Sequence, residues 1–541
     1  MDNFSLFETA YFSALFGWSP SYGSMSGFHE YDTRLEDWSA EGHQKRIATL
    51  RGLRERLQRL DRAHLTDGQK LDSELLASQL EAELFDLATL ETWRRNPMAY
   101  VGKPGEAVDV LMKRDFAPAD ERISSATARL RQVPALLDAM RTNVENPPRE
   151  FTELASQMAK GSVEFLRKTV PEWADGHGRD QGGLKALHVA ARQAADAMAT
   201  AATWLEQDLL PKSKGAYAIG AEAFSRKLLH EEMVDIPLDR LLAMGEANLK
   251  KDQAAFRAGA QQVAPGQTPQ AAMTVLAQDH PGEANLVPAT RETIEKIRQF
   301  LVDRQIVTLP AERRPLIAET PPFARNGAFA SMDSPGAFEK QATEAFYYVT
   351  PPEANWDARH KEEHLRLFNR PVLEVITIHE AFPGHFMQFL YAPGWPSKTR
   401  KLLGPASNVE GWAHYGEQMM IEEGYGGSDP KLRLAQLSEA LLRDCRYVVG
   451  IKMHTQGMTV AQGAKFFVEQ GYQEPANAYE EARRGAYNPT YLYYTLGKLL
   501  LYELRGEYQN KLGAGYSLRG FHDAFLKEGP LPFALLRRAL L

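Results

Sequence analysis

Apolar residues recur at helical spacing through roughly the first 215 residues of the chain. Positions i, i+3, i+4 and i+7 are repeatedly apolar, which is typical of amphipathic α-helices. The segments with this pattern are Gln44 to Leu60, Leu71 to Leu90, Ala119 to Val144, Glu153 to Val170 and Leu184 to Leu210. Proline and glycine predict turns or hinges at Pro147-Pro148, Gly182-Gly183 and Pro211 to Gly215, and a loop-rich stretch from Gly259 to Pro269. The first half of the chain is therefore predicted to be helical.

The pattern changes between Ile317 and Pro352, where glycine and proline flank short runs rich in aromatic residues. Ala328 to Met332 and Ala345 to Thr350 are predicted to be short strands of a small sheet. We expect a mostly α-helical fold with this small accessory sheet. Residues 1–215 are predicted to form an N-terminal helical region and residues 216–541 a second region, with one continuous domain as the alternative.

Composition narrows the class of protein. The 541 residues are 44% hydrophobic and 25% charged, so the chain has enough apolar residues for a large core. Its net charge of −7 provides no broad cationic surface, which argues against nucleic acid as a partner. The single Cys445 excludes an intramolecular disulfide and is predicted to be a buried, inert thiol.

Two further features concern location. No run of about 18 apolar residues predicts a membrane span. The residues from Met1 to Glu8 lack the basic and apolar regions of a signal peptide, so both the cytoplasm and the periplasm remain open as compartments. No pattern indicates an oligomeric state.

The strongest chemical signal is a cluster of imidazoles and carboxylates between His379 and Glu410. Catalytic zinc sites typically have three protein ligands and a fourth position for water. His379, His385 and Glu410 are predicted to bind one Zn²⁺ ion. Glu380, directly beside the first ligand, is predicted to be the general base.

The six-residue interval between the two histidines conflicts with a continuous helix. On an ideal α-helix it turns the second side chain through about 240° relative to the first. Pro383 and Gly384 favour a kink or bulge that would bring His385 back toward His379. The alternative is that His385 is a core histidine.

His360 and His364 form a second pair with the four-residue spacing that places two side chains on one helix face. Their neighbours are charged, whereas His379 follows an apolar run. We therefore interpret His360 and His364 as a surface feature, with adventitious metal binding as the alternative.

Two segments of the chain, one beginning at His379 and one at Glu410, resemble motifs of the domain-of-unknown-function 885 family. This family is a group within the zincin-like metallopeptidase clan. The family pattern H-E-x-x-P-G-H-x-x-Q is matched by His379, Glu380, Pro383, Gly384, His385 and Gln388. The pattern E-G-W-A-x-Y-x-E is matched by Glu410, Gly411, Trp412, Ala413, Tyr415 and Glu417. The resemblance continues through His454, Arg484, Tyr494 to Gly497 and Arg505. It implies a helical zincin-like metallohydrolase fold with a deep cleft.

The resemblance also implies roles for individual residues. It favours Glu410 over His414 as the third ligand, and Glu417 is then a candidate to orient an imidazole, with a solvated helix charge as the alternative. The residues matched near the C-terminus are candidates to stabilise an oxyanion or to bind substrate: His454, Tyr494 and Arg484. Their alternatives are a structural histidine, aromatic packing and a structural ion pair.

The sequence departs from the family pattern at two places. Gly450 to His454 stands where the family often has D-T-G-x-H, and Asn488 to Tyr491 stands near its P-G-Q-A run. These differences leave the substrate class open. We expect a zinc metallopeptidase acting on peptides, with a zinc esterase or small-molecule amidohydrolase as one alternative. A metal-stabilised helical binding protein is the non-enzyme alternative.

Overall fold

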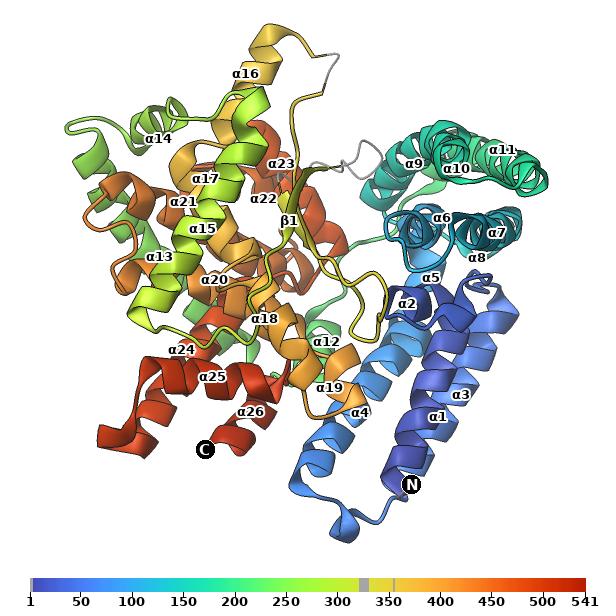
Figure 1. Cartoon of the computed structure of the whole chain (residues 1–541), viewed down its shortest axis with the longest axis horizontal. Coiled ribbons are helices and arrows are strands. Elements are labelled where there is room, and N and C mark those ends of the chain that lie inside the picture. The colour runs from blue at the N-terminus through green and yellow to red at the C-terminus, as the bar shows by residue number, and fades with distance from the viewer. Residues whose placement is uncertain (1–2, 321–329, 354–355) are drawn as a thin grey trace. The chain divides into compact units, whose positions relative to one another are not determined.

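The computed structural model of the chain describes residues 3–320, 330–353 and 356–541 and is mostly helical (Figure 1). It divides into two compact units. The first unit comprises Met1–Tyr217 and Pro335–Thr343, and the second comprises Ala218–Ser334 and Glu344–Leu541. The chain therefore leaves the second unit once, for nine residues, and then returns to it.

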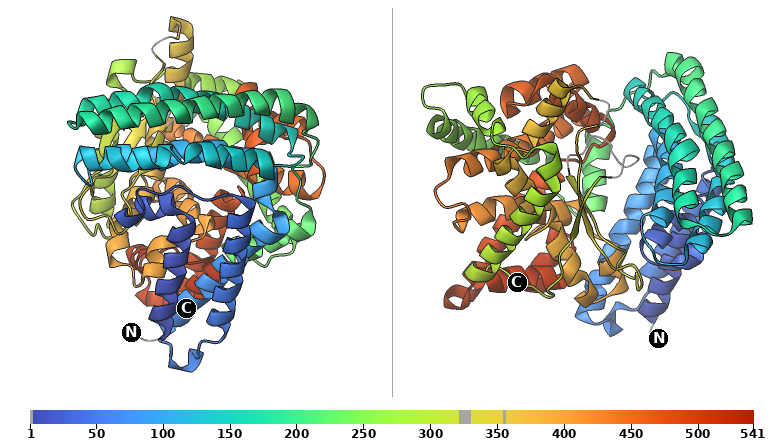
Figure 2. Two further views of the ribbon diagram at one scale, coloured as in Figure 1. Left: turned by 90° about the vertical axis from the view of Figure 1, so that its right-hand side faces the viewer. Right: turned by 45° about the horizontal axis from the view of Figure 1, so that its top comes forward.

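The first unit consists of helices that bury their apolar stripes against one another. Its helices are α1 (Asn3–Trp18), α2 (Pro20–Met25), α3 (Ala40–Gln58), α4 (Asp67–Phe85), α5 (Thr92–Arg95), α6 (Pro97–Met112), α7 (Ala119–Leu130), α8 (Val133–Asn143), α9 (Arg149–Glu164), α10 (Val170–His177) and α11 (Gln181–Trp204). Figure 2 shows the long helices α9 and α11 side by side. The helical prediction for this region is confirmed.

Two details of that prediction are wrong. The segment Ala119 to Val144 forms two helices. α7 ends at Leu130, and Pro134 lies in the first turn of α8. Gly182-Gly183 is not a turn but the start of α11. The Asp180 carboxylate accepts hydrogen bonds from both glycine amides, each at 3.0 Å, and so caps the helix.

The returning segment is held in the first unit by specific contacts. The amide of Phe338 donates to the carbonyl of Ser26 at 3.0 Å, and the rings of Phe28 and Phe338 lie 5.0 Å apart. Glu339 lies 2.9 Å from Nε2 of His29. The nine residues are therefore part of the fold of the first unit.

The second unit is also built from helices. They are α12 (Ala221–Glu232), α13 (Leu238–Val263), α14 (Pro269–Ala277), α15 (Leu286–Arg304), α16 (Ala358–Leu367), α17 (Arg370–Glu380), α18 (His385–Tyr391), α19 (Lys398–Leu402), α20 (Ala406–Glu422), α21 (Pro430–Thr455), α22 (Val460–Gly471), α23 (Pro475–Tyr487), α24 (Tyr493–Leu512), α25 (Leu518–Glu528) and α26 (Phe533–Leu540). The loop predicted to begin at Gly259 begins only after Val263, because Gly259 and Ala260 are buried in α13.

One three-stranded sheet accompanies these helices. Its strands are β1 (Leu316–Glu319), β2 (Ala330–Asp333) and β3 (Phe346–Val349), in the order β1-β3-β2. β1 is parallel to β3, and β2 is antiparallel to it, with Ala330 opposite Val349. The strand predicted at Ala345 to Thr350 is confirmed. The one predicted at Ala328 to Met332 is confirmed from Ala330 onward, and its first two residues lie outside the described residues. The sequence did not predict β1.

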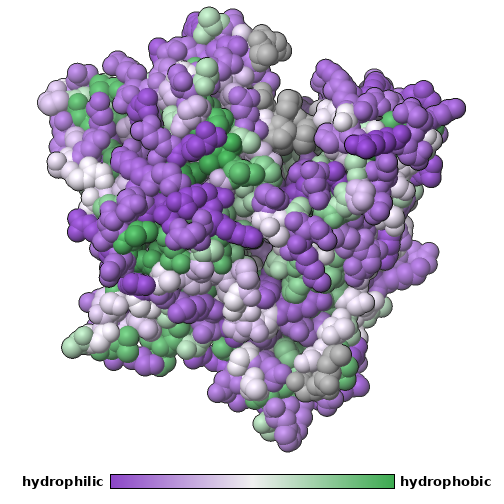
Figure 3. Space-filling view, in the orientation of Figure 1, coloured by the Kyte–Doolittle hydropathy of each residue, from purple (hydrophilic) through white to green (hydrophobic). Residues whose placement is uncertain are grey.

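The core of the second unit forms where α13 packs on α21 and α20 packs on α24. α17 contacts both α20 and α21, so three helices that carry motif residues share this core. Hydrophilic side chains cover most of the face seen in Figure 3. No described helix is long and apolar enough to cross a membrane. The deep cleft that the family resemblance implies stays a prediction.

Candidate metal centre

The first motif lies at a break between two helices. α17 ends at Glu380, residues 381–384 form a turn, and α18 starts at His385. The ring centroids of His379 and His385 are 4.8 Å apart and the ring planes are almost perpendicular. The break therefore brings together two imidazoles that a continuous helix would separate.

The turn is stabilised by close backbone packing. A β-carbon at Gly384 would lie 1.7 Å from the carbonyl oxygen of His379, so only glycine fits. The Trp412 indole donates a hydrogen bond of 2.7 Å to the carbonyl of Pro383. Trp412 belongs to the second motif and lies in α20, so this bond fixes α20 against the turn.

Glu410 approaches both imidazoles from α20. Its Oε2 lies 3.3 Å from Nε2 of His379 and 3.5 Å from Nε2 of His385. This oxygen is buried and has no hydrogen-bond partner among the described residues. Burial alone would raise the pKa of Glu410, but the imidazoles of His385 and His379 hold it well below its usual range.

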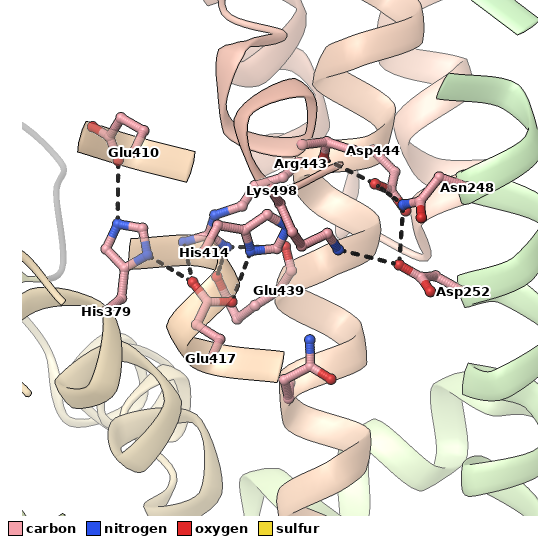
Figure 4. Close-up of polar contacts among 12 residues, drawn as sticks. Asn248, Asp252, His379, Glu410, His414, Glu417, Glu439, Arg443, Asp444 and Lys498 are labelled. Carbon is pink, nitrogen blue, oxygen red and sulfur yellow. Dashed lines mark hydrogen bonds and ion pairs between the residues drawn. The ribbon is translucent and has the colours of Figure 1, made fainter. Parts of the chain in front are cut away.

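Glu417 orients His379 from the opposite side of the ring (Figure 4). Nδ1 of His379 lies 2.7 Å from Oε1 of Glu417, which is fully buried. The alternative of a solvated helix charge is therefore wrong for Glu417. With Nδ1–H donating to this carboxylate, the lone pair of Nε2 is directed toward Glu410, which is the arrangement that metal-binding histidines need.

Glu417 in turn has two further partners. Its Oε2 lies 3.1 Å from Nδ1 of His414, and Nη2 of Arg443 lies 3.4 Å from Oε1. Burial would raise the pKa of Glu417, but Arg443, His414 and His379 keep it well below its usual range. Burial likewise lowers the pKa of His414 to about 3, so this ring is neutral and donates to Glu417. His414 is thus a support for Glu417.

These contacts also set the charge of His379. Burial favours the neutral ring, but the nearby carboxylates of Glu410 and Glu417 outweigh it and raise the pKa of His379 to about 9.

The Glu380 carboxylate is fixed by the sheet. Its Oε2 accepts a hydrogen bond of 3.0 Å from the amide of Met332 in β2. The sheet itself is fixed to α17, since the hydroxyls of Tyr347 and Thr377 are 3.2 Å apart. Potential ligand atoms of His379, Glu380 and His385 all lie within 4.8 Å of one another. Glu380 therefore lies beside the cluster that Glu410 completes.

Tyr494 is also close to the cluster. Its ring centroid is 6.5 Å from that of His379. Burial and the Glu410 carboxylate raise the pKa of Tyr494 to about 12, so its hydroxyl keeps its proton. α24 can come this near because Gly411 and Gly497 face each other. A β-carbon at Gly497 would lie 1.9 Å from the Ser407 carbonyl oxygen.

Arg484 and His454 differ in position. Nη2 of Arg484 donates to the Tyr494 hydroxyl at 3.1 Å, which connects it with the cluster. Nε2 of His454 lies 2.8 Å from the Gly485 carbonyl, and its ring stacks on Phe224. Burial lowers the pKa of His454 to about 4, so the ring is neutral. These contacts place His454 among α12, α21 and α23 and favour the structural alternative.

The second histidine pair is held in another way. The His360 ring is exposed and stacks on Trp356, with centroids 3.9 Å apart. Nε2 of His364 lies 2.9 Å from the Thr350 carbonyl. Their helix also carries the exposed Arg359–Glu363 ion pair. The interpretation of His360 and His364 as a surface feature agrees with these contacts.

The single cysteine, Cys445, is buried as predicted.

Sequence reasoning missed two groups at the site. Arg443 supports Glu417 from α21, and the amide of Met332 holds Glu380. Neither belongs to a motif, and a backbone amide has no signature in the sequence. An arginine at a buried helix position was the one available signal for Arg443.

The fold and the site together define a class of protein. It is a helical protein with a cluster of histidine and glutamate side chains at a break between two helices. The chain belongs to the family described as "Bacterial protein of unknown function (DUF885)", whose model matches residues 20–540. No curated protein matches the chain.

Two solved structures are similar over nearly their whole length. A "putative lipoprotein of unknown function" from Shewanella oneidensis is 26% identical, with a TM-score of 0.83 and 99% of each chain covered. A "putative lipoprotein" from Colwellia psychrerythraea is 18% identical, with a TM-score of 0.83 over 100% of this chain and 98% of that one. The second likeness concerns the fold alone.

Proposed function

We propose that this protein is a zinc-dependent hydrolase of zincin-like type that cleaves amide bonds in peptides. The observation that carries the proposal is the spacing of two imidazole nitrogens around Oε2 of Glu410. Ligands about 2.0–2.1 Å from a tetrahedral zinc ion are separated from one another by about 3.3–3.4 Å. The separations of 3.3 and 3.5 Å from Glu410 to the two imidazoles agree with that geometry.

The donor set fits zinc as well as the spacing does. His379, His385 and Glu410 would hold the ion through two nitrogens and one oxygen, the composition of many catalytic zinc sites. The buried oxygen of Glu410 without a hydrogen-bond partner is accounted for by a cation. When bound, zinc supplies a Lewis acid that makes water nucleophilic near neutral pH.

The remaining groups supply proton transfer and orientation. Glu380 accepts the proton of the attacking water and returns it to the leaving amine, while the Met332 amide keeps its carboxylate in position. The Tyr494 hydroxyl, which keeps its proton at neutral pH, donates a hydrogen bond to the developing oxyanion. We do not assign this role to His454, because its Nε2 is held by Gly485.

The same groups would also hydrolyse an ester or a small amide. An experiment must therefore decide among peptide, ester and small-amide substrates. Glu380 argues against a purely structural metal, since a structural site needs no general base beside it. The Shewanella oneidensis protein is described as a lipoprotein, which favours the periplasm among the two compartments left open for this chain.

The test combines metal content with turnover. Purified protein is expected to hold about one zinc ion per chain and to cleave members of a peptide library in a chelator-sensitive way. Glu380→Gln is expected to keep the metal and to lose about 10²–10⁴-fold in turnover. Glu374→Gln, on the same helix but paired with Lys296, is the matched control and should change neither.

Two results would contradict the proposal. Undiminished turnover in Glu380→Gln would remove its assigned role. Protein that holds no zinc after exposure to it would remove the whole mechanism. Zinc binding with ester but no peptide cleavage would shift the proposal to an esterase.

A further inference from the structure

Three arginines surround the Tyr494 ring. The guanidinium carbons of Arg446, Arg443 and Arg484 lie 5.1, 5.7 and 5.8 Å from the ring centroid. They come from two helices, α21 and α23. Three cations around one buried ring need anionic partners.

Two of these arginines have carboxylate partners within the protein. Arg446 binds Glu481 through two hydrogen bonds of 2.7 Å each, a bidentate pair. Arg443 binds Glu439 at 2.7 Å and lies 3.4 Å from Glu417. Their charges are therefore compensated.

Arg484 differs from the other two. Its hydrogen-bond partner is the neutral Tyr494 hydroxyl, and no carboxylate among the described residues is hydrogen-bonded to it. The residue Arg484 is partly exposed, and the neighbouring Arg446 repels its guanidinium. Glu481, which Arg446 binds, attracts Arg484 without a hydrogen bond to it. Arg484 therefore offers unused donors toward any anion that reaches it.

Arg484 is also near the candidate metal centre. The Tyr494 ring lies 5.8 Å from the guanidinium carbon of Arg484 and 6.5 Å from the His379 ring. One residue of extended peptide spans at most about 3.6 Å. In an extended peptide, a group bound at Arg484 is thus at most about three residues away from a bond held at His379.

We propose that Arg484 binds a substrate carboxylate located one to three residues from the bond to be cleaved. This inference rests on the proposed hydrolase function and names its substrate class. The carboxylate has two sources, the C-terminus of a short peptide or the side chain of an aspartate or glutamate. A guanidinium recognises both by the same two-pronged geometry.

The experiment measures binding without turnover. Immobilised protein stripped of metal is offered three libraries of tetrapeptides: free acids, the same sequences with C-terminal amides, and free acids with Asn and Gln in place of Asp and Glu. Captured peptides are quantified by mass spectrometry. Wild type, Arg484→Gln and Arg483→Gln are compared, since Arg483 is the next residue of the same helix and binds Glu480.

Recognition of the C-terminus predicts at least about tenfold weaker capture of the amides by wild type. Recognition of an acidic side chain instead predicts a similar loss for the Asn and Gln library. In either case Arg484→Gln abolishes the preference and Arg483→Gln keeps it. Absence of both preferences in wild type, or their survival in Arg484→Gln, would overturn the inference even if a variant were poorly folded.

A parallel assay with zinc separates this inference from the proposed function. A carboxylate preference that depends on Arg484, without chelator-sensitive cleavage, keeps the binding site and rejects the hydrolase. Chelator-sensitive cleavage of all three libraries at equal rates keeps the hydrolase and rejects the binding site.

Discussion

His379 and His385 lie at the ends of two helices that meet at a turn, whereas His360 and His364 lie on successive turns of the single helix α16. The first pair is separated by six residues and the second by four. Yet the first pair faces Glu410 and is backed by Glu417, while the second contacts Trp356 and a backbone carbonyl.

The difference lies in what surrounds each pair. A metal site needs a third ligand, an oriented imidazole and low exposure to water, and long-range packing supplies all three. Glu410 and Glu417 reach His379 from a helix that starts 27 residues further along the chain. For α16, four-residue spacing provides a common face and nothing more.

The largest effect is expected on removal of an imidazole from the first pair. His379→Ala and His385→Ala should reduce bound zinc from about one ion per chain to almost none, because two ligands do not hold the ion against water. Mass spectrometry of the metal after gel filtration measures this. Near-stoichiometric zinc in His379→Ala would mean that His379 is not a ligand.

A smaller effect is expected behind the ligands. Glu417→Gln keeps an acceptor for Nδ1 of His379 but removes the charge, so zinc affinity should fall by about 10–100-fold. Competition with a fluorescent chelator gives the affinity. Glu423→Gln, at the end of the same helix, is the control, and equal losses in both variants would show an effect unrelated to His379.

Helix α16, which carries the second histidine pair, and helix α20, which carries Glu410 and Glu417, also begin differently. The difference can be tested by changing the pH. α16 is capped by the exposed Asp357, whereas the first turn of α20 donates to the buried Glu232, from Ser407 at 2.9 Å. Burial raises the pKa of Glu232 to about 7. The folded protein therefore holds this proton more tightly than the unfolded chain does.

The protonated Glu232 side chain contributes fully to stability below about pH 4.5, and this contribution is lost as the pH rises toward about 7. Glu232→Gln imitates the protonated side chain. It should be more stable than wild type at pH 8, by on the order of 3 kcal/mol, and equal at pH 4.5. Chemical denaturation at both pH values measures this, and a constant difference would contradict the assignment.

The smallest effect is expected for the second pair. His360→Ala and His364→Ala should leave zinc content unchanged. His360→Ala, at an exposed position, should alter the free energy of unfolding by at most about 0.5 kcal/mol. A loss of zinc in either variant would reverse the comparison between the two pairs.

Local patterns predicted the helices better than their ends. Periodicity indicated α3, α4, α9 and α11, since each buries one apolar face. It joined α7 to α8, because apolar spacing continues across their break. The glycine pair Gly182-Gly183 was predicted to be a turn, but Asp180 caps the helix that starts there. β1 was missed because its partner β3 is about 30 residues away.

For the site, the motifs indicated which residues to examine, and the Pro-Gly pair indicated where the helix breaks. What they did not contain was the set of long-range contacts. His454 matched a family position as well as Tyr494 did, yet only packing distinguishes a ring held by Gly485 from one beside His379. Whether these residues bind zinc stays a prediction.

The nine residues that return to the first unit affect the order in which the protein can be completed during synthesis. A chain that has grown only to Tyr217 lacks Phe338 and Glu339, so Ser26 and His29 have no partner from that segment. Those partners emerge after more than a hundred further residues, which belong to the second unit. The first unit therefore cannot finish folding as an N-terminal piece, and a protein cut at Tyr217 would separate it from part of its own structure.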